Sequence, residues 1–172
     1  EAISELVEVP LERRLVCDLF NGATTSIAKE LFEELGSQTI LINAQPDGHF
    51  PAGNPEPNKE SLRRLGNMVR DSGAEIGFGF DGDGDRMMPV DENGETPSPD
   101  RVLAAYAGYV VRANGGGTVV THMGASMSVE ETVEDAGGGV VRTKVGDVHV
   151  VEAMLEKGAI FGGEPVGAWI HP

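Results

Sequence analysis

Residues 74–90 read AEIGFGFDGDGDRMMPV: an apolar run, a group of three aspartates and a second, shorter apolar run. Each apolar run has the length and composition of a β-strand. Asp81, Asp83 and Asp85 stand at every second position, with a glycine in each gap and Arg86 directly behind. In layered α/β folds, functional loops follow the carboxyl ends of strands. The stretch therefore predicts a strand that ends in an acidic loop.

The sequence on both sides of this stretch alternates between strand and helix patterns. Apolar runs of strand length lie at 13–20, 38–43, 74–80, 86–90, 118–122, 139–143 and 159–163. Helical spacing of apolar residues marks 26–35, where the apolar positions are Ile27, Leu31, Phe32 and Leu35, and also 59–72, 100–113, 128–136 and 147–157. Such alternation predicts an α/β fold, with mostly parallel sheets flanked by helices.

The segment TPSPD at 96–100 marks a domain boundary, because its two prolines interrupt regular structure before a new helix. We therefore expect two small α/β domains, 1–96 and 97–172. Three helix starts carry capping signals. These are Asn58 before 59–72, Ser98 with Pro99 before 100–113, and Ser128 with Glu131 in a capping-box pattern.

The composition is strongly acidic, with 13 Lys and Arg against 28 Asp and Glu, a net charge of −15. The negative charge is spread along the chain, which suits a high-salt cytoplasm where self-repulsion is screened, so we expect a halophilic protein. Basic patches are absent, which argues against nucleic acid as a partner. No stretch has membrane-spanning length, and the first ten residues do not resemble a signal peptide, so we expect a cytoplasmic protein.

The single cysteine, Cys17, lies in the apolar run LVCDLF. One cysteine cannot form an internal disulfide, and no second one is present for a metal cluster. We expect Cys17 to act as a small buried hydrophobic residue.

The spacing of the three aspartates favours a divalent metal loop. In a straight strand the outer two would be roughly 13 Å apart at about 3.3 Å per residue. Magnesium needs oxygens at about 2.1 Å, so the chain must curl, and the intervening glycines permit this. Without a cation, three clustered carboxylates would raise one another's pKa. We therefore expect Mg²⁺ on Asp81, Asp83 and Asp85.

Two other metal loops share part of this pattern. An EF-hand would use the three aspartates and Glu92 at its twelfth position, but Arg86 stands where the EF-hand has glycine, and the flanks are strands. A magnesium-dependent aspartyl phosphatase places Asp-x-Asp-Gly after an apolar strand, but normally continues with threonine where this chain has Asp85. Arg86 beside the carboxylates suits a phosphate that contacts both the cation and the guanidinium.

The motifs resemble those of the α-D-phosphohexomutases, which include phosphoglucomutase, phosphomannomutase and phosphoglucosamine mutase. FDGDGDR (80–86) is similar to their magnesium loop, and NAQPDGHFP (43–51) and PEPNKESL (55–62) to segments that precede it. RTKVGDVHV (142–150) resembles a loop of their third domain. GGEPVGAWIHP (162–172) resembles their sugar-binding loop. The similarity runs in order from about residue 13 to the C-terminus.

This resemblance implies a partial enzyme that spans the second domain and most of the third. The first domain, which carries a phosphoserine, and the fourth, which grips the substrate phosphate, would be the missing partners. The substrate would be a hexose phosphate, and the reaction would interconvert its 1- and 6-phosphates through a bisphosphorylated sugar. Magnesium on the aspartates would polarise the serine phosphate, and Arg86 would stabilise the charge of the transferring group.

The resemblance also assigns residues in the expected domain 97–172, which corresponds to the family's third domain. Glu164 would accept hydrogen bonds from two sugar hydroxyls, and Gly163 and Gly167 would let the loop approach the sugar. Val166 and Ala168 replace residues that are usually polar, so the preferred sugar stays open. Lys144 and Asp147 occupy the loop where some relatives have a proton-transferring histidine, although the favoured role of Asp147 is to cap the helix that follows.

A second class of function also fits the sequence: a metal-binding α/β module with no chemistry of its own. The residues alone leave it, and the aspartyl phosphatase, open.

Overall fold

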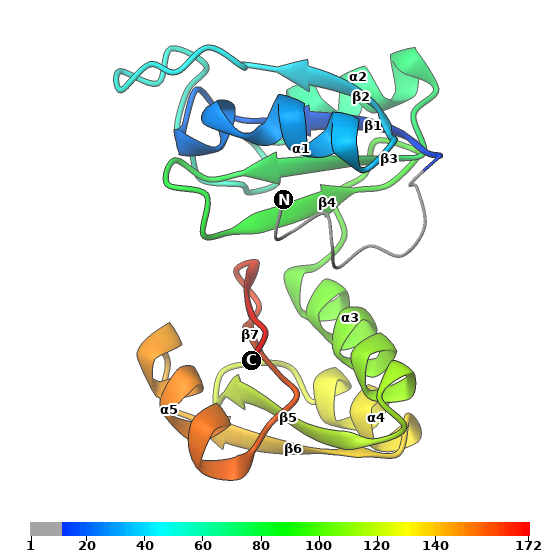
Figure 1. Ribbon diagram of the computed structural model, residues 1–172, viewed down its shortest axis with the longest axis vertical. Coiled ribbons are helices and arrows are strands. Elements are labelled where there is room, and N and C mark those ends of the chain that lie inside the picture. The colour runs from blue at the N-terminus through cyan, green and yellow to red at the C-terminus, as the bar shows by residue number, and fades with distance from the viewer. Residues whose placement is uncertain (1–11) are drawn as a thin grey trace. The chain divides into compact units, whose positions relative to one another are not determined.

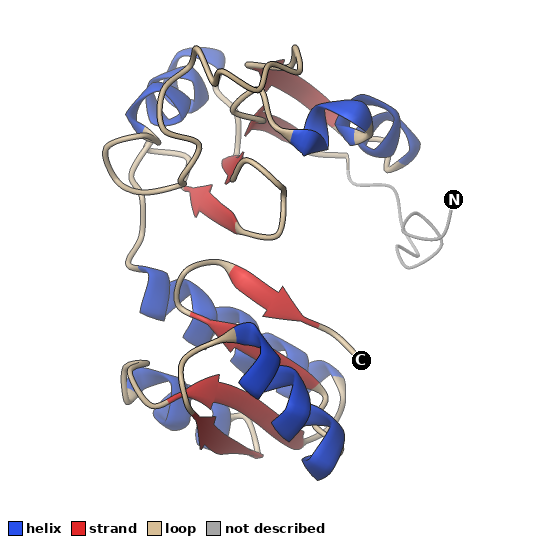
Figure 2. Cartoon of the chain, turned by 90° about the vertical axis from the view of Figure 1, so that its left-hand side faces the viewer, coloured by secondary structure: helices blue, strands red, loops and turns tan. Residues whose placement is uncertain are grey.

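The computed structural model describes residues 12–172; the first eleven residues of the expected domain 1–96 lie outside this range. The chain separates into two compact units, Glu1–Pro97 and Ser98–Pro172 (Figure 1). Each unit is a four-stranded sheet with helices on it, so the expected α/β class is confirmed (Figure 2).

The sheet of the first unit has the strand order β2-β1-β3-β4. Its strands are β1 (Arg14–Asp18), β2 (Gln38–Ile42), β3 (Ile76–Phe80) and β4 (Met87–Val90). β1 pairs in parallel with β2 and β3, whereas β4 returns antiparallel beside β3. The carboxyl ends of β1 and β3 are therefore neighbours, and the acidic loop follows β3.

Helices cover both faces of this sheet. α1 (Ala28–Glu34), which follows the short 3₁₀ helix η2 (Ala23–Ser26), packs through Ala28 and Phe32 against Cys17 and Leu19. α2 (Arg63–Ser72) covers the other face, where Leu65 and Val69 are fully buried. A Cβ on Gly77 would lie 2.7 Å from a methyl carbon of Val69, so α2 packs directly on the backbone of β3.

Two helix predictions in this unit are wrong in detail. Ile27 precedes α1 and is 53% exposed, because the chain at 23–26 forms η2 and the α-helix starts only at Ala28. α2 starts at Arg63 and not at residue 59. The Asn58 carboxamide oxygen does accept hydrogen bonds from the backbone N–H groups of Glu60 and Ser61, at 2.9 and 3.1 Å, but it caps a preceding turn.

The sheet of the second unit has the order β6-β5-β7-β8. Its strands are β5 (Gly117–His122), β6 (Gly138–Thr143), β7 (Phe161–Glu164) and β8 (Ala168–Ile170). β5 pairs in parallel with β6 and β7, and β8 is antiparallel to β7. The helices are α3 (Pro99–Ala113), α4 (Ser128–Asp135) and α5 (Asp147–Lys157).

The side chains of successive β5 residues pack on opposite faces of this sheet. Val119 belongs to a cluster with residues of α3 and α4, whereas Val120 packs with Val150 and Met154 of α5. Ser98 precedes α3 with extended backbone and Pro99 is its first residue, as expected, although the Ser98 side chain makes no capping hydrogen bond. The capping box at Ser128 is wrong, because Met127 is the cap residue and Ser128 already lies inside α4.

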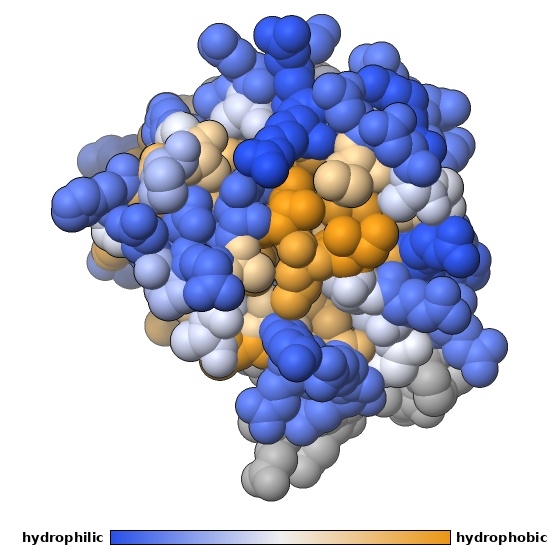
Figure 3. All heavy atoms as spheres, turned by 90° about the horizontal axis from the view of Figure 1, so that it is seen from above, coloured by the Kyte–Doolittle hydropathy of each residue, from blue (hydrophilic) through white to orange (hydrophobic). Residues whose placement is uncertain are grey.

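None of the helices within residues 12–172 combines the length and apolar character that a bilayer crossing requires. The face of the molecule in Figure 3 is mainly hydrophilic, with one hydrophobic band. The edge strand β2 of the first unit carries an exposed apolar side chain, Ile40.

Candidate functional site

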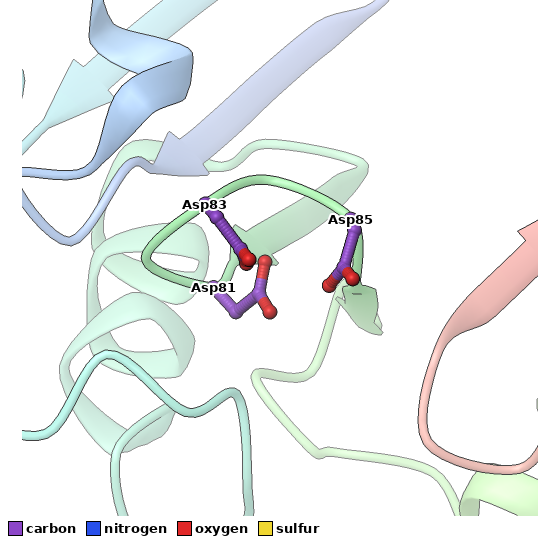
Figure 4. A group of neighbouring side chains, drawn as sticks. All are labelled: Asp81, Asp83 and Asp85. Atoms are coloured by element: carbon purple, nitrogen blue, oxygen red, sulfur yellow. The ribbon is translucent and has the colours of Figure 1, made fainter. Parts of the chain in front are cut away.

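The acidic loop joins β3 to β4, and its three carboxylates converge (Figure 4). One ligand oxygen from each of Asp81, Asp83 and Asp85 lies within 4.8 Å of the others. Asp81 is buried, whereas the other two are exposed. The structure therefore brings together the three residues that the sequence singled out.

The Asp81 side chain curls the loop from within. Its Oδ1 accepts hydrogen bonds from the backbone N–H groups of Gly84 (2.9 Å) and Arg86 (3.1 Å). The backbone N–H of Asp81 donates to the carbonyl of Arg86 at 3.1 Å, which closes the loop at its base. Gly84 has φ of +85°, a conformation that other residues adopt only with strain. The curl expected from the sequence is present.

A second loop, between β1 and η2, supports the acidic loop from outside. The N–H of Ala23 donates to the carbonyl of Gly82 at 3.0 Å. A Cβ on Gly22 would lie 2.5 Å from the same carbonyl oxygen, and a Cβ on Gly84 would lie 2.6 Å from a methyl carbon of Thr24. The two loops are in backbone contact, which only glycine at position 22 allows.

Arg86 bridges two acidic groups. Its Nε donates to Asp81 Oδ2 at 2.8 Å, and its Nη1 donates to Glu56. Asp85 Oδ1 lies 3.4 Å from Nε. Glu56 was not predicted as a site residue; its only signal is its position in PEPNKESL, one of the segments that resembles the family.

The pKa values of Asp81 and Asp85 are shifted in opposite directions. Burial by itself would raise the pKa of Asp81, but hydrogen bonds from the Arg86 backbone, Asp85, the Arg86 side chain and Gly84 together lower it. The pKa of Asp85 is raised, first by its hydrogen bond with Asp81, then by burial and by the negative charges of Asp81 and Asp83. Mutual repulsion of this kind is what a divalent cation relieves, so the residues fit magnesium with its preference for carboxylate oxygens.

The second unit presents Glu164 at the carboxyl end of β7. This carboxylate is only 7% exposed, so it is not an ordinary surface acid. Its Oε1 accepts a hydrogen bond from the backbone N–H of Gly146 at 2.8 Å, which ties β7 to the loop between β6 and α5. His122, at the end of β5, lies with Nε2 4.0 Å from the same oxygen.

The glycines around Glu164 have local structural roles. A Cβ on Gly163 would lie 2.8 Å from a Leu103 methyl carbon, so packing against α3 requires glycine there. Gly167 has φ of +87°, and its N–H donates to the Glu164 carbonyl at 3.2 Å in the turn between β7 and β8. Val166 is exposed in that turn.

Lys144 and Asp147 are both exposed and flank Gly146 in the loop after β6. Asp147 is the first residue of α5 and not its cap, which is Gly146. The Asp147 carboxylate accepts a hydrogen bond from the next backbone N–H, that of Val148, at 2.8 Å. A negative charge in the first helical turn is favourable, so the structure gives Asp147 a role in helix stability.

His122 was not predicted as a site residue, because His49, His122 and His171 show no ligand spacing in the sequence. Its position was a usable signal, since it ends the strand pattern TVVTH, as the acidic loop ends AEIGFGF.

Comparison with known families identifies both units. The family models for phosphoglucomutase/phosphomannomutase α/β/α domains II and III match residues 2–94 and 98–172. The chain therefore belongs to the phosphoglucomutase/phosphomannomutase family, the α-D-phosphohexomutases. It supplies the second and third domains of that fold.

Relatives and solved structures agree with this family. A probable phosphoglucosamine mutase of Methanosarcina barkeri is 48% identical over 92% of this chain and 36% of its own length. One from Pyrococcus abyssi is 44% identical over the whole chain and 38% of its own length. The crystal structure of a phosphoglucomutase/phosphomannomutase family protein from Burkholderia thailandensis superposes with a TM-score of 0.88, at 32% identity, over 95% of this chain and 36% of that one.

The chain thus spans little more than a third of the length of the relatives it matches. Neither the metal-binding module nor the aspartyl phosphatase is supported by these matches.

Proposed function

We propose that this chain is the central part of a phosphohexomutase that interconverts hexose 1-phosphate and hexose 6-phosphate. The observation that carries the proposal is the convergence of three aspartates beside Arg86, inside a segment matched by the domain II family model. The names of the relatives make glucosamine phosphate the first substrate to test, with glucose and mannose phosphates beside it.

Each unit contributes a different function. Asp81, Asp83 and Asp85 would hold magnesium, which supplies positive charge to a phosphoryl oxygen when bound. The Arg86 guanidinium, fixed by Asp81 and Glu56, presents its remaining donors to the transferring phosphoryl group.

Glu164 would accept hydrogen bonds from adjacent sugar hydroxyls, which an ionised carboxylate does well. Val166 offers no polar group, so discrimination between sugars at this loop falls to Glu164 and the backbone. The serine phosphate donor and the clamp for the substrate phosphate belong to the remainder of the parent enzyme.

The first test assays the full-length parent with the 1-phosphates of glucosamine, glucose and mannose, each with a catalytic amount of the matching 1,6-bisphosphate. Conversion to the 6-phosphate is expected for at least one sugar. Asp83→Asn in the parent should lower kcat/KM by at least about 100-fold, because charge stabilisation does most of the work in phosphoryl transfer.

Asp71→Asn is the matched control, because it makes the same charge change on an exposed residue near the end of α2. It should leave kcat/KM unchanged. Full activity of Asp83→Asn with unaltered magnesium dependence would contradict the metal assignment.

The 172-residue chain alone should bind magnesium, measured by titration calorimetry, and show no turnover. The three aspartates lie in one loop, whereas the proposed phosphate donor lies elsewhere in the parent. Turnover by the purified chain above a no-protein control would contradict the proposal that the phosphate donor lies elsewhere in the parent enzyme.

A further inference from the structure

His122 and Glu164 end two adjacent parallel strands, β5 and β7. The strands are paired at Val119 with Phe161 and at Val120 with Gly162. Continuing this register by two residues brings His122 beside Glu164, with both side chains on the same face of the sheet. Both are nearly buried, at 9% and 7% exposure. Burying a carboxylate beside an imidazole costs free energy unless the two groups interact with each other or with other hydrogen-bonding groups.

The hydrogen bonding of His122 determines which of its two ring nitrogens carries the proton. The backbone N–H of Gly124 donates to Nδ1 at 2.9 Å. Nδ1 must therefore accept, and the neutral ring carries its proton on Nε2. Nε2 is the atom that lies 4.0 Å from Glu164 Oε1. The imidazole thus directs an N–H dipole toward the carboxylate.

Two groups from different loops converge on the same carboxylate oxygen. Oε1 already accepts the Gly146 N–H at 2.8 Å, from the loop after β6. The His122 separation of 4.0 Å is longer than a hydrogen bond. Contacts of this kind in ligand-free sites commonly shorten when the substrate binds.

The backbone that carries His122 is held firmly. Arg142 of β6 donates to the carbonyls of His122 (3.2 Å), Met123 (3.1 Å) and Ala125 (2.8 Å). Toward β7, the hydroxyl of Thr121, the residue before His122 in β5, donates to the carbonyl of Gly163 at 2.8 Å. The ends of β5 and β7 therefore form a rigid frame for the two side chains.

We infer that His122 is a positioning residue for Glu164, acting together with the Gly146 N–H. The two groups engage Oε1 and fix the rotation of the carboxylate, so that Oε2 and the open side of Oε1 face two neighbouring hydroxyls of the sugar. The inference rests on the proposed function, because it assigns a partner to the residue that would bind the sugar.

The test uses two substitutions of His122 in the full-length parent. His122→Asn places an amide oxygen near the position of Nδ1, so the Gly124 bond survives, but it removes the donor that faces Glu164. His122→Gln extends further and can present an N–H near the position of Nε2. We expect Asn to raise KM for the hexose phosphate about tenfold, the loss of one hydrogen bond to a charged group, with kcat within about twofold. Gln should keep KM within about threefold.

A double-mutant cycle separates positioning from general structural damage. In a Glu164→Gln background, His122→Asn should change KM by less than about twofold, because the group it acts through is already altered. His149→Asn, an exposed histidine on α5, is the control and should leave KM unchanged.

A second measurement does not depend on any variant. Long-range ¹H–¹⁵N NMR of the histidine rings in the wild-type protein should show His122 neutral with its proton on Nε2. A proton on Nδ1 would overturn the inference, as would an unchanged KM for His122→Asn or an equal effect of that substitution with and without Glu164. A wild-type parent inactive on all three sugars would overturn the proposed function instead, and this inference with it.

Discussion

Cys17 lies in the middle of β1, the strand that pairs with both β2 and β3, and it has no exposed surface. Its role as a small buried hydrophobic residue is thereby confirmed. Burial, and secondly the negative charge of Asp18, raise the pKa of its thiol to about 12. The reactive thiolate is therefore almost absent at neutral pH.

We predict that Cys17 does not react with a thiol-specific disulfide reagent in the native protein at pH 8. Unfolding in denaturant should expose it and lead to stoichiometric labelling. The absorbance of the thiolate released from the reagent measures the extent of labelling in the native and in the unfolded protein, and Cys17→Ala supplies the blank. Rapid labelling of the folded protein would show that β1 opens readily.

At the scale of the elements, Arg142 connects several segments of the second unit, and no sequence pattern predicted these contacts. From β6, its guanidinium pairs with Glu130 of α4 and donates to backbone carbonyls between His122 and Ser126. One planar side chain thus fixes the loop from β5 to α4. Lysine cannot reproduce this, because its ammonium lacks the fork of donors.

We predict that Arg142→Lys lowers the free energy of unfolding by about 1–3 kcal/mol, since several carbonyls and a carboxylate lose donors. Thermal or urea unfolding followed by circular dichroism measures this. Arg112→Lys, at the end of α3, makes the same exchange and should change stability by less than about 0.5 kcal/mol. Equal stability of Arg142→Lys and wild type would contradict the bridging role.

The same ion pair predicts a pH dependence. The hydrogen bond from Arg142, its largest cause, lowers the pKa of Glu130 below the ordinary value of 4.5. A lowered folded-state pKa adds stability above pH 4.5 that is lost as the pH falls through the folded value. The melting temperature of Glu130→Gln should therefore lie below that of wild type at pH 7, and the gap should narrow below pH 4.5. A constant gap would show that the charge is immaterial.

The strands β1 to β7 and their order of appearance could be predicted from the sequence because apolar runs bounded by glycine, proline and asparagine are local signals. β8 was not predicted, because its three residues lie inside the segment interpreted as a loop. Helix starts were less predictable: at α2 and α4 the cap residue is decided by the path of the preceding turn, which depends on distant contacts. The acidic loop was predictable since its residues are consecutive. The partners of Glu56, His122 and Gly146 were not predictable, because each of these residues reaches its partner through the pairing of segments far apart in sequence.

At the scale of the whole molecule, the dominant property is the net charge of −15. Much of it is borne by exposed carboxylates, and the mainly hydrophilic face in Figure 3 agrees with this composition. Repulsion between such charges acts against compact structure and weakens as salt shortens the screening length to about 3 Å at molar concentration.

We predict that raising potassium chloride from about 0.1 to 2 M increases the melting temperature by about 4–8 °C. This is the shift that roughly 1 kcal/mol produces in a domain of about 60–100 residues, the size of each of the two units. Sorbitol at equal osmolality is the control, because it is uncharged. A melting temperature that does not respond to salt would contradict the halophilic interpretation of the composition.

The backbone contact between Gly22 and Gly82 has a consequence for any attempt to borrow the acidic loop. The carboxylates of FDGDGDR converge partly because a segment sixty residues earlier presses on the loop and donates to it through Ala23. An excised heptapeptide loses that outside support, as well as the strands that hold its two ends together. Grafting the heptapeptide into a turn of another protein would transfer its sequence but not the loop conformation that brings the carboxylates together. The portable module is the entire first sheet with its β1–η2 connection.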